Sequence, residues 1–316
     1  MVLSKMSWIA FGFGALGFLG CGGADFEPTA QGDTPVEGSA KAKAAKTFLS
    51  LGDSIPFGFN PLLMPPYAPP PPPSAFIGYP EVLASRGYDV TNASCPGETS
   101  GSFLDPNPAT APDNGCRAFK AFPALSLHAD YETTQIAFAV AAIQAKAAVQ
   151  NGKFDFVTLN IGANDLFVLQ NSCSTAANPL ACIQNGLPGV VVAYSQHLAS
   201  AYDQMAAAYD ADHPNFKGQF VGVTTYATNY NDPLAVGALT LMNNALAAFT
   251  SSKGGILADG YLAFQIESSK DGGVGDACAA GLLIRKPDNT CDIHPSEKGR
   301  KLLADTVLKA LNEGEQ

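Results

Sequence analysis

Residues 154–165 read FDFVTLNIGAND, an apolar run that ends in a glycine and two polar side chains. Residues 47–54 (TFLSLGDS) repeat the pattern, a short apolar segment followed by Gly-Asp-Ser. Short apolar segments bounded by turn residues are typical of strands that are buried on both faces of a parallel sheet. The two stretches therefore predict parallel strands that carry polar residues at their carboxyl ends.

The rest of the chain alternates strand and helix patterns. Further strands are expected at residues 88–91, 220–225 and, with a weaker pattern, 261–266. Alanine-rich helices are expected at residues 133–149, 190–209, 233–250 and 295–311. Strands that alternate with long helices indicate βαβ units around a buried parallel sheet. Ligands of such sheets bind beyond the carboxyl ends of the strands, so functional residues are expected directly after each strand.

The composition excludes several classes of protein. The chain has 316 residues, 47% of them hydrophobic and 15% charged, which is enough to bury a large core. Its 18 basic and 28 acidic residues give a formal charge of −10. This charge argues against nucleic acid as a partner, because nucleic-acid binders carry a basic surface. The 31 glycines and 23 prolines predict long irregular loops and exclude a coiled coil or compact bundle.

The first 20 residues have the pattern of a signal peptide. Lys5 is followed by an uncharged, mostly apolar run over residues 6–19, which is shorter than the ~20 residues that a membrane-spanning helix needs. Residues 18–22 (FLGCG) resemble the lipobox of bacterial lipoproteins, so Cys21 is the expected lipidation site. Simple secretion is the alternative. A core helix is disfavoured because glycine recurs four times between residues 12 and 20.

Residues 21–46 are expected to form a flexible tether, because their composition buries too little apolar surface to fold. The folded domain is then expected over residues 47–314. An acidic chain does not favour anionic lipid, so membrane attachment is expected only through the lipid anchor.

Six cysteines follow Cys21, and an even number in an exported chain indicates disulfides. They fall into three couples that are close in sequence, which favours the pairs Cys95 with Cys116, Cys173 with Cys182, and Cys278 with Cys291. A zinc site is the alternative. It is disfavoured because neither a CxxC motif nor a histidine cluster accompanies the cysteines.

Four motifs stand after the predicted strands or before the last helix: LSLGDSIPFGF (49–59), SCPGETSGSF (94–103), TLNIGANDL (158–166) and DIHPSEKG (292–299). In this order they resemble the conserved blocks of the SGNH hydrolases, also called the GDSL esterase and lipase family. The resemblance extends over about residues 47–312. It implies an α/β fold, a three-layer αβα sandwich around a five-stranded parallel sheet in flavodoxin-like order.

The resemblance also assigns roles to residues. Ser54 stands in the nucleophile position and His294 in that of the base, and a serine hydroxyl needs such an imidazole to accept its proton. The expected oxyanion hole consists of the Ser54 N–H, the Gly97 N–H and the Asn164 side chain, which would hold the charge of the tetrahedral intermediate. No metal or organic cofactor is implied.

One position departs from the family pattern. The family places an aspartate three residues before the catalytic histidine, where this chain has Cys291, and the acid here is Asp292. Residues i and i+2 of an extended segment project to the same side, so Asp292 is the expected partner of His294. Asp288 and a backbone carbonyl are the alternatives.

Structural roles compete for several residues. Ser54 could be a helix cap, although residues 55–58 (IPFG) are a poor start for a helix. Asp53 is expected to order the nucleophile loop, and Asp165 to be a turn residue that follows Asn164. Three further histidines have no family motif around them and are expected on the surface or as satisfied core residues: His128, His197 and His213.

A proline-rich insert occupies residues 61–74 (PLLMPPYAPPPPPS). Its composition favours a stiff polyproline II segment. Because the insert closely follows the nucleophile motif, one expectation is that four of its side chains border the acyl-binding cleft: Leu62, Leu63, Met64 and Tyr67. A solvent-exposed spacer or a peptide-docking segment is an equal alternative.

The sequence as a whole predicts a monomeric serine esterase or lipase of the cell envelope or the extracellular medium. Its substrate would be a small-molecule, lipid or acylated-carbohydrate ester. The alternative is a non-catalytic surface lipoprotein that uses the same fold as a binding or scaffold module.

Overall fold

The computed structural model describes residues 45–149, 152–210, 220–270 and 274–314. The predicted signal peptide, the lipidation site Cys21, most of the predicted tether and His213 lie outside these residues.

A five-stranded parallel sheet forms the centre of the domain, with the strand order β2-β1-β3-β4-β5. The strands are β1 (Thr47–Gly52), β2 (Asp89–Asn92), β3 (Phe156–Asn160), β4 (Phe220–Val223) and β5 (Ile256–Ala258). This is the flavodoxin-like order, and the expected α/β fold is confirmed. The register pairs Gly52 with Asn160, so the polar residues that follow β1 and β3 leave the same edge of the sheet.

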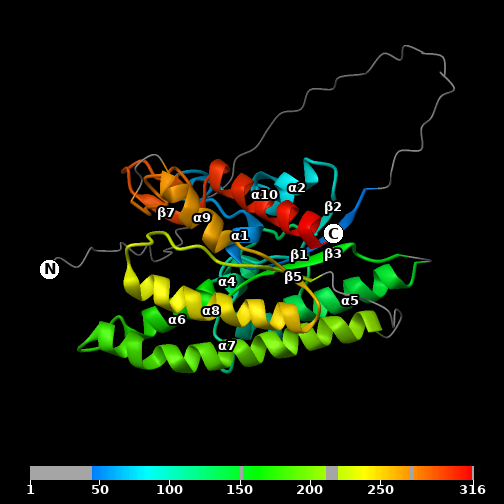
Figure 1. Ribbon diagram of the computed structural model, residues 1–316, viewed down its shortest axis with the longest axis horizontal. Coiled ribbons are helices and arrows are strands. Elements are labelled where there is room, and N and C mark those ends of the chain that lie inside the picture. Colours follow the sequence, from blue (N-terminus) through cyan, green and yellow to red (C-terminus); the bar gives the residue numbers. More distant parts are fainter. Residues whose placement is uncertain (1–44, 150–151, 211–219, 271–273, 315–316) are drawn as a thin grey trace, which may run out of the picture. The chain divides into compact units, whose positions relative to one another are not determined.

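Helices cover both faces of the sheet (Figure 1). The layer on one face contains α5 (Gln135–Ala147), α6 (Ala163–Cys173), α7 (Pro179–Asp210) and α8 (Pro233–Ser252). The opposite layer contains α2 (Tyr79–Ala84), α9 (Gly260–Ser268) and α10 (Glu297–Gly314). Side chains of a strand alternate between faces. Accordingly Leu49 belongs to the core beneath α5 and α7, and its neighbour Phe48 to the core beneath α2 and α10.

Short elements lie at the carboxyl edge of the sheet. They include the helices α1 (Ser54–Phe57), α3 (Ser100–Leu104) and α4 (Cys116–Ala121). An antiparallel pair, β6 (Leu283–Arg285) and β7 (Cys291–Pro295), precedes α10. The sequence patterns did not predict this hairpin, and β7 includes the motif around His294.

Two predictions of secondary structure are wrong. Residues 261–266 are not a strand but part of α9, and the fifth strand is β5. The Asp259 side chain caps this helix by accepting the Leu262 N–H at 3.0 Å, and its buried residues Gly260, Phe264 and Ser268 recur every four positions. The second error is at α1, which forms although residues 55–58 predict no helix, because the Asp53 carboxylate accepts the Ile55 N–H at 2.9 Å.

The six described cysteines form three disulfides: Cys95–Cys116, Cys173–Cys182 and Cys278–Cys291. These are the couples that the sequence favours. The proline-rich insert begins with one 3₁₀ turn, Pro61–Leu63, and runs into a second, Pro73–Ala75, so it is not the single stiff segment that its composition predicts. Met64 of this insert is buried in a core cluster with Phe57 and Phe76, whereas Tyr67 is 41% exposed.

Candidate active site

Ser54 and His294 lie in contact at the carboxyl edge of the sheet. The Oγ atom of Ser54 lies 2.8 Å from Nε2 of His294. Ser54 begins α1, directly after β1, and His294 comes from β7, directly before α10. Both are largely buried, 9% and 8% exposed. This geometry allows the imidazole to accept the hydroxyl proton.

Asp292 lies on the opposite side of the imidazole. Its Oδ1 makes a short hydrogen bond with Nδ1 of His294 and accepts the His294 backbone N–H at 3.1 Å. Burial opposes ionisation of Asp292, but the hydrogen bond and charge of His294 together hold its pKa below the ordinary value. An ionised Asp292 fixes the proton on Nδ1 and leaves Nε2 free to accept from Ser54.

Asp288, the alternative acid, has other partners. Its carboxylate accepts the Thr290 N–H at 2.9 Å and the Thr290 hydroxyl at 2.6 Å. These hydrogen bonds lower the pKa of the exposed Asp288 carboxyl. The structure thus places Asp292 in contact with His294, whereas the Asp288 side chain contacts Thr290.

The segments that carry Gly97 and Asn164 are hydrogen-bonded to the Ser54 loop or to each other. The Cys95 N–H donates to the Gly52 carbonyl at 3.0 Å, which ties the segment after β2 to the end of β1. The Asn164 Nδ2 donates to the Glu98 carbonyl at 3.0 Å, which ties the start of α6 to the residue after Gly97. Gly97 has a φ of 84°, a conformation that favours glycine.

Asp53 is fully buried beside Ser54. Besides capping α1, its carboxyl has an Oδ2 atom that finds no hydrogen-bond partner among the described residues. Burial raises the pKa of Asp53 to about 7, although the charge of His294 acts in the opposite direction. The expectation that Asp53 orders the nucleophile loop agrees with its capping bond.

The prediction that Asp165 is a turn residue is wrong. Asp165 lies, partly buried, in the first turn of α6. Its carboxylate accepts the Ser100 N–H at 2.9 Å and the Ser100 hydroxyl at 2.5 Å, so it joins α6 to α3. Burial raises the pKa of Asp165 to about 6. Asp165 therefore holds together the two segments that follow Gly97 and Asn164.

The two described histidines outside the motifs are hydrogen-bonded within the fold, as expected. His128 Nε2 lies 3.0 Å from the Phe57 carbonyl. His197 Nδ1 lies 2.9 Å from the Ser100 hydroxyl, and burial lowers the pKa of His197.

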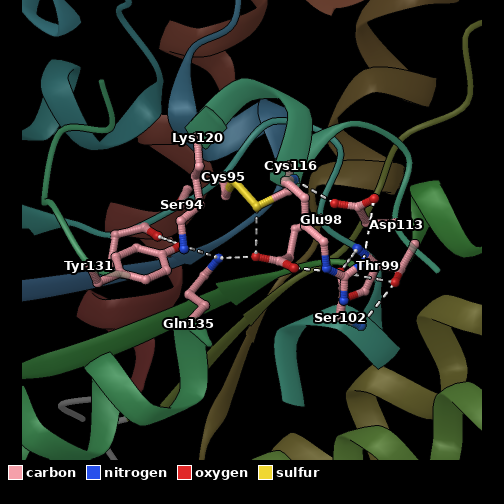
Figure 2. Close-up of a disulfide and its surroundings, with 12 residues drawn as sticks. Ser94, Cys95, Glu98, Thr99, Ser102, Asp113, Cys116, Lys120, Tyr131 and Gln135 are labelled. Atoms are coloured by element: carbon pink, nitrogen blue, oxygen red, sulfur yellow. Dashed lines mark hydrogen bonds and ion pairs between the residues drawn. A yellow bond between two sulfur atoms is a disulfide. The ribbon is translucent and has the colours of Figure 1, made fainter. Parts of the chain in front are cut away.

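Sequence reasoning missed Glu98, whose carboxylate is buried between a disulfide and two polar side chains (Figure 2). It accepts a short hydrogen bond from the Ser102 hydroxyl and one from Gln135 Nε2 at 3.2 Å, and it lies 3.3 Å from Cys116 Sγ. Gln135 in turn binds both backbone groups of Gly52, the N–H at 2.6 Å and the carbonyl at 3.0 Å. Burial raises the pKa of Glu98 to about 7. Glu98 directly follows Gly97 in the second motif. Its contact with Gln135 joins distant parts of the sequence, and no sequence pattern indicates it.

Among the described residues, one group has metal-ligand spacing: Cys95, Glu98 and Cys116. The two sulfurs are bonded to each other and are not free thiolates, the form in which cysteine binds metal. A cavity of about 750 Å³ lies beside this disulfide, and Glu98, Lys120 and Tyr131 are among its lining residues. The lining does not include Ser54 or His294.

Known proteins resemble this chain as follows. A phospholipase A1 from Streptomyces albidoflavus NA297 is 17% identical, with a TM-score of 0.48 over 86% of this chain and 100% of that one. LAE5, an alpha/beta hydrolase from the metagenome of Lake Arreo, is 16% identical, with a TM-score of 0.47 over 85% and 97%. A variant of an acetyl xylan esterase from Geobacillus stearothermophilus is 18% identical, with a TM-score of 0.44 over 85% and 95%. No curated protein matches the chain.

The model of the GDSL-like lipase/acylhydrolase family matches residues 50–302, which is most of the chain and includes both Ser54 and His294. The protein therefore belongs to the GDSL-like lipase/acylhydrolase family.

Proposed function

We propose that this protein is a serine esterase that hydrolyses carboxylic esters with Ser54 as nucleophile, His294 as base and Asp292 as the residue that orients His294. The observation that carries the proposal is the continuous contact from the Ser54 hydroxyl through both ring nitrogens of His294 to the Asp292 carboxylate. This arrangement has the geometry of a Ser-His-Asp triad.

In the first half of the reaction, Ser54 Oγ attacks the ester carbonyl carbon while its proton moves to His294 Nε2. The carbonyl oxygen becomes an oxyanion in a tetrahedral intermediate. Collapse of the intermediate breaks the bond to the alkoxy oxygen, which leaves as an alcohol after taking the proton from Nε2. An acyl ester on Ser54 and a neutral imidazole remain.

In the second half, His294 accepts a proton from water as the water oxygen attacks the acyl carbon. The second tetrahedral intermediate expels Ser54 Oγ, which regains the proton from Nε2, and the carboxylic acid leaves. In both halves the Ser54 N–H, the Gly97 N–H and the Asn164 amide donate to the oxyanion. Loss of one such donor costs on the order of 100- to 1000-fold in rate in other acyl-transfer enzymes.

The surroundings of His294 favour an apolar acyl group. The Phe59 ring lies 5.0 Å from the imidazole of His294, and the Phe76 ring stacks on Phe59 at 6.0 Å. Phe59 is only partly buried and offers a hydrophobic surface next to the reacting atoms, and the fully buried Phe76 packs against it. We expect p-nitrophenyl butyrate to be a better substrate than p-nitrophenyl acetate.

The proposal includes export. Disulfides persist in oxidising compartments, so the three bridges indicate a protein outside the cytoplasm. The N-terminal sequence favours attachment through a diacylated Cys21, which the mass of the mature N-terminus from the native host would test.

Hydrolysis of p-nitrophenyl esters by the purified protein tests the activity. We expect turnover that survives EDTA and that disappears in Ser54→Ala and His294→Ala. Activity lost in EDTA and restored by zinc or calcium would overturn the metal-free mechanism. A folded protein that hydrolyses none of these esters would favour a non-catalytic role for the fold.

A further inference from the structure

Asn114 contacts both residues that are proposed to complete the oxyanion hole with Ser54. Its side-chain Nδ2 donates to Oδ1 of Asn164 at 2.9 Å. Its backbone N–H donates to the Gly97 carbonyl at 2.8 Å. The approach is close, since a Cβ atom on Gly97 would lie 2.5 Å from the Asn114 carbonyl oxygen. No sequence motif marks Asn114, which lies outside the four family blocks.

The contact with Asn164 matters because a side-chain amide has two different ends. The nitrogen carries two N–H donors and the oxygen only accepts. One N–H of Asn164 is used by the Glu98 carbonyl at 3.0 Å, which leaves the second for an oxyanion. A rotation of the amide by 180° would present the oxygen instead, and an oxygen repels the developing charge.

Two groups therefore set the orientation of the Asn164 amide. The Glu98 carbonyl accepts from its nitrogen, and the Asn114 side chain donates to its oxygen. If Asn114 lost its donor, only one hydrogen bond would oppose rotation of a residue that is 4% exposed.

Asn114 is itself held in place by covalent structure. It lies two residues before Cys116. Cys116 forms a disulfide with Cys95, which in turn lies two residues before Gly97. Figure 2 shows this disulfide with the neighbouring Asp113 and Glu98. The Asp113 carboxylate accepts the Arg117 N–H at 2.6 Å, so the turn before α4 is also hydrogen-bonded. The segment with Asn114 and the segment with Gly97 are thus joined by one covalent bond and one backbone hydrogen bond.

We propose that Asn114 is a positioning residue of the oxyanion hole, which keeps an N–H of Asn164 directed at the reacting carbonyl oxygen. This inference rests on the proposed esterase function and adds a residue to it. Asn114 acts through Asn164 and contacts no reacting atom.

The variants Asn114→Asp and Asn114→Ala test the proposal. At pH 8 an aspartate would place a carboxylate against Asn164 Oδ1, so the Asn164 amide should rotate to donate to it. We expect kcat to fall about 100-fold in Asn114→Asp and about 10-fold in Asn114→Ala, with KM changed less than about threefold, because binding precedes formation of the oxyanion. Asn178→Asp is the matched control. Asn178 is exposed, and within the described parts of the chain its side chain makes one hydrogen bond, in which Oδ1 accepts the Ala181 N–H, a bond that an aspartate preserves.

The pH profile separates orientation from loss of structure. A protonated aspartic acid donates a hydrogen bond, as Asn114 does. The activity of Asn114→Asp relative to wild type should therefore rise as the pH falls from 8 to 5, whereas the relative activity of Asn114→Ala should stay constant. Equal thermal midpoints would exclude unfolding, and if Asn114→Asp does not fold, Asn114→Ala decides alone.

A double-mutant cycle tests whether Asn114 acts through Asn164. In an Asn164→Ala background, Asn114→Asp should cause no further loss of kcat. Wild-type kcat in both Asn114 variants, or an equal loss in the Asn164→Ala background, would overturn the proposal. A wild-type protein that hydrolyses no ester and is not labelled by a fluorophosphonate would instead show that the esterase function itself is wrong.

Discussion

His294 Nε2 lies 2.8 Å from Ser54 Oγ, although 240 positions of sequence separate the two residues. Ser54 is fixed because it follows β1, which ends at Gly52 and is paired with β2 on one side and β3 on the other. His294 is fixed because β7 is held at one end by the Cys278–Cys291 disulfide and because the Tyr226 hydroxyl donates to the Ile293 carbonyl at 2.7 Å. The reacting pair therefore depends on two elements that are far apart in the sequence, and each is held in place by its own contacts.

The acid that orients His294 can be identified by substitution. Asp292→Asn should lower kcat at least ~100-fold, because an amide in this place no longer selects the productive tautomer of His294. Asp288→Asn is the matched control, since its carboxylate contacts Thr290 and not His294. It should keep nearly full activity in the same p-nitrophenyl ester assay, at an unchanged thermal midpoint. A crippled Asp288→Asn with an active Asp292→Asn would reverse the assignment.

Two disulfides should differ in their effect on activity. Replacing Cys95 and Cys116 by serine releases the segment around Gly97 and Asn114, whereas replacing Cys173 and Cys182 releases the far end of α6. Each double substitution should lower the free energy of unfolding by about 3 kcal/mol. Only the first should also lower kcat, when both variants are assayed well below their melting temperatures. Equal activity of the two double variants would show that the Cys95–Cys116 bridge only adds stability.

Gly97→Ala should lower both stability and activity by more than the strain of an alanine at positive φ explains. Gly97 and Gly87 both have positive φ, 84° and 93°. An added Cβ meets the Asn114 carbonyl oxygen at 2.5 Å from Gly97 but has open space at Gly87. Gly87→Ala should therefore lose about 1 kcal/mol of stability and keep its activity. Gly97→Ala should lose more stability and most of its kcat, which denaturant unfolding and ester hydrolysis would measure. Similar behaviour of the two variants would contradict the close approach.

Buried carboxyls should make the protein less stable as the pH rises from 5 to 8. Burial raises the pKa of Asp53 and Glu98 to about 7 and that of Asp165 to about 6. The folded state then binds more protons than the unfolded chain between pH 4 and 7, so stability falls as these groups lose their protons.

Glu98→Gln replaces one of these titratable carboxyls by an amide that does not titrate, and it keeps a side chain that can form hydrogen bonds. The loss of stability between pH 5 and pH 8 should become smaller by on the order of 2 kcal/mol. Thermal unfolding at both pH values would measure it. A pH dependence identical to wild type would show that Glu98 does not titrate in this range.

The sequence predicts the parts of the site that follow long apolar strands. Ser54 and Asn164 stand directly after apolar runs, and parallel strands bring such ends to one edge. The fifth strand could not be recognised, because Ile256–Ala258 has only three residues and the following stretch, 261–266 (YLAFQI), is a mostly apolar run of strand-like length. The N-cap contact of Asp259 with Leu262 determines that this stretch is helical.

The contacts that support the site were beyond sequence reasoning. Glu98 contacts Gln135, and Asn114 contacts Asn164, across segments that are far apart in the chain. The effect of each contact depends on which atom donates and which accepts. Asp165 was misjudged for the same reason, because its partner Ser100 lies 65 positions away. Local patterns predict secondary structure and motifs, whereas pairings of this kind follow only from the tertiary fold.

Covalent labelling of Ser54 tests the central claim most directly. A fluorophosphonate reacts with a serine hydroxyl only when a base activates it and an oxyanion hole receives its oxygen. Intact mass followed by peptide mapping should show one phosphonyl group per molecule on Ser54 in the wild-type protein, and none in Ser54→Ala or His294→Ala. A folded wild-type protein that stays unlabelled, or one that is labelled on another residue, would contradict the proposed esterase mechanism.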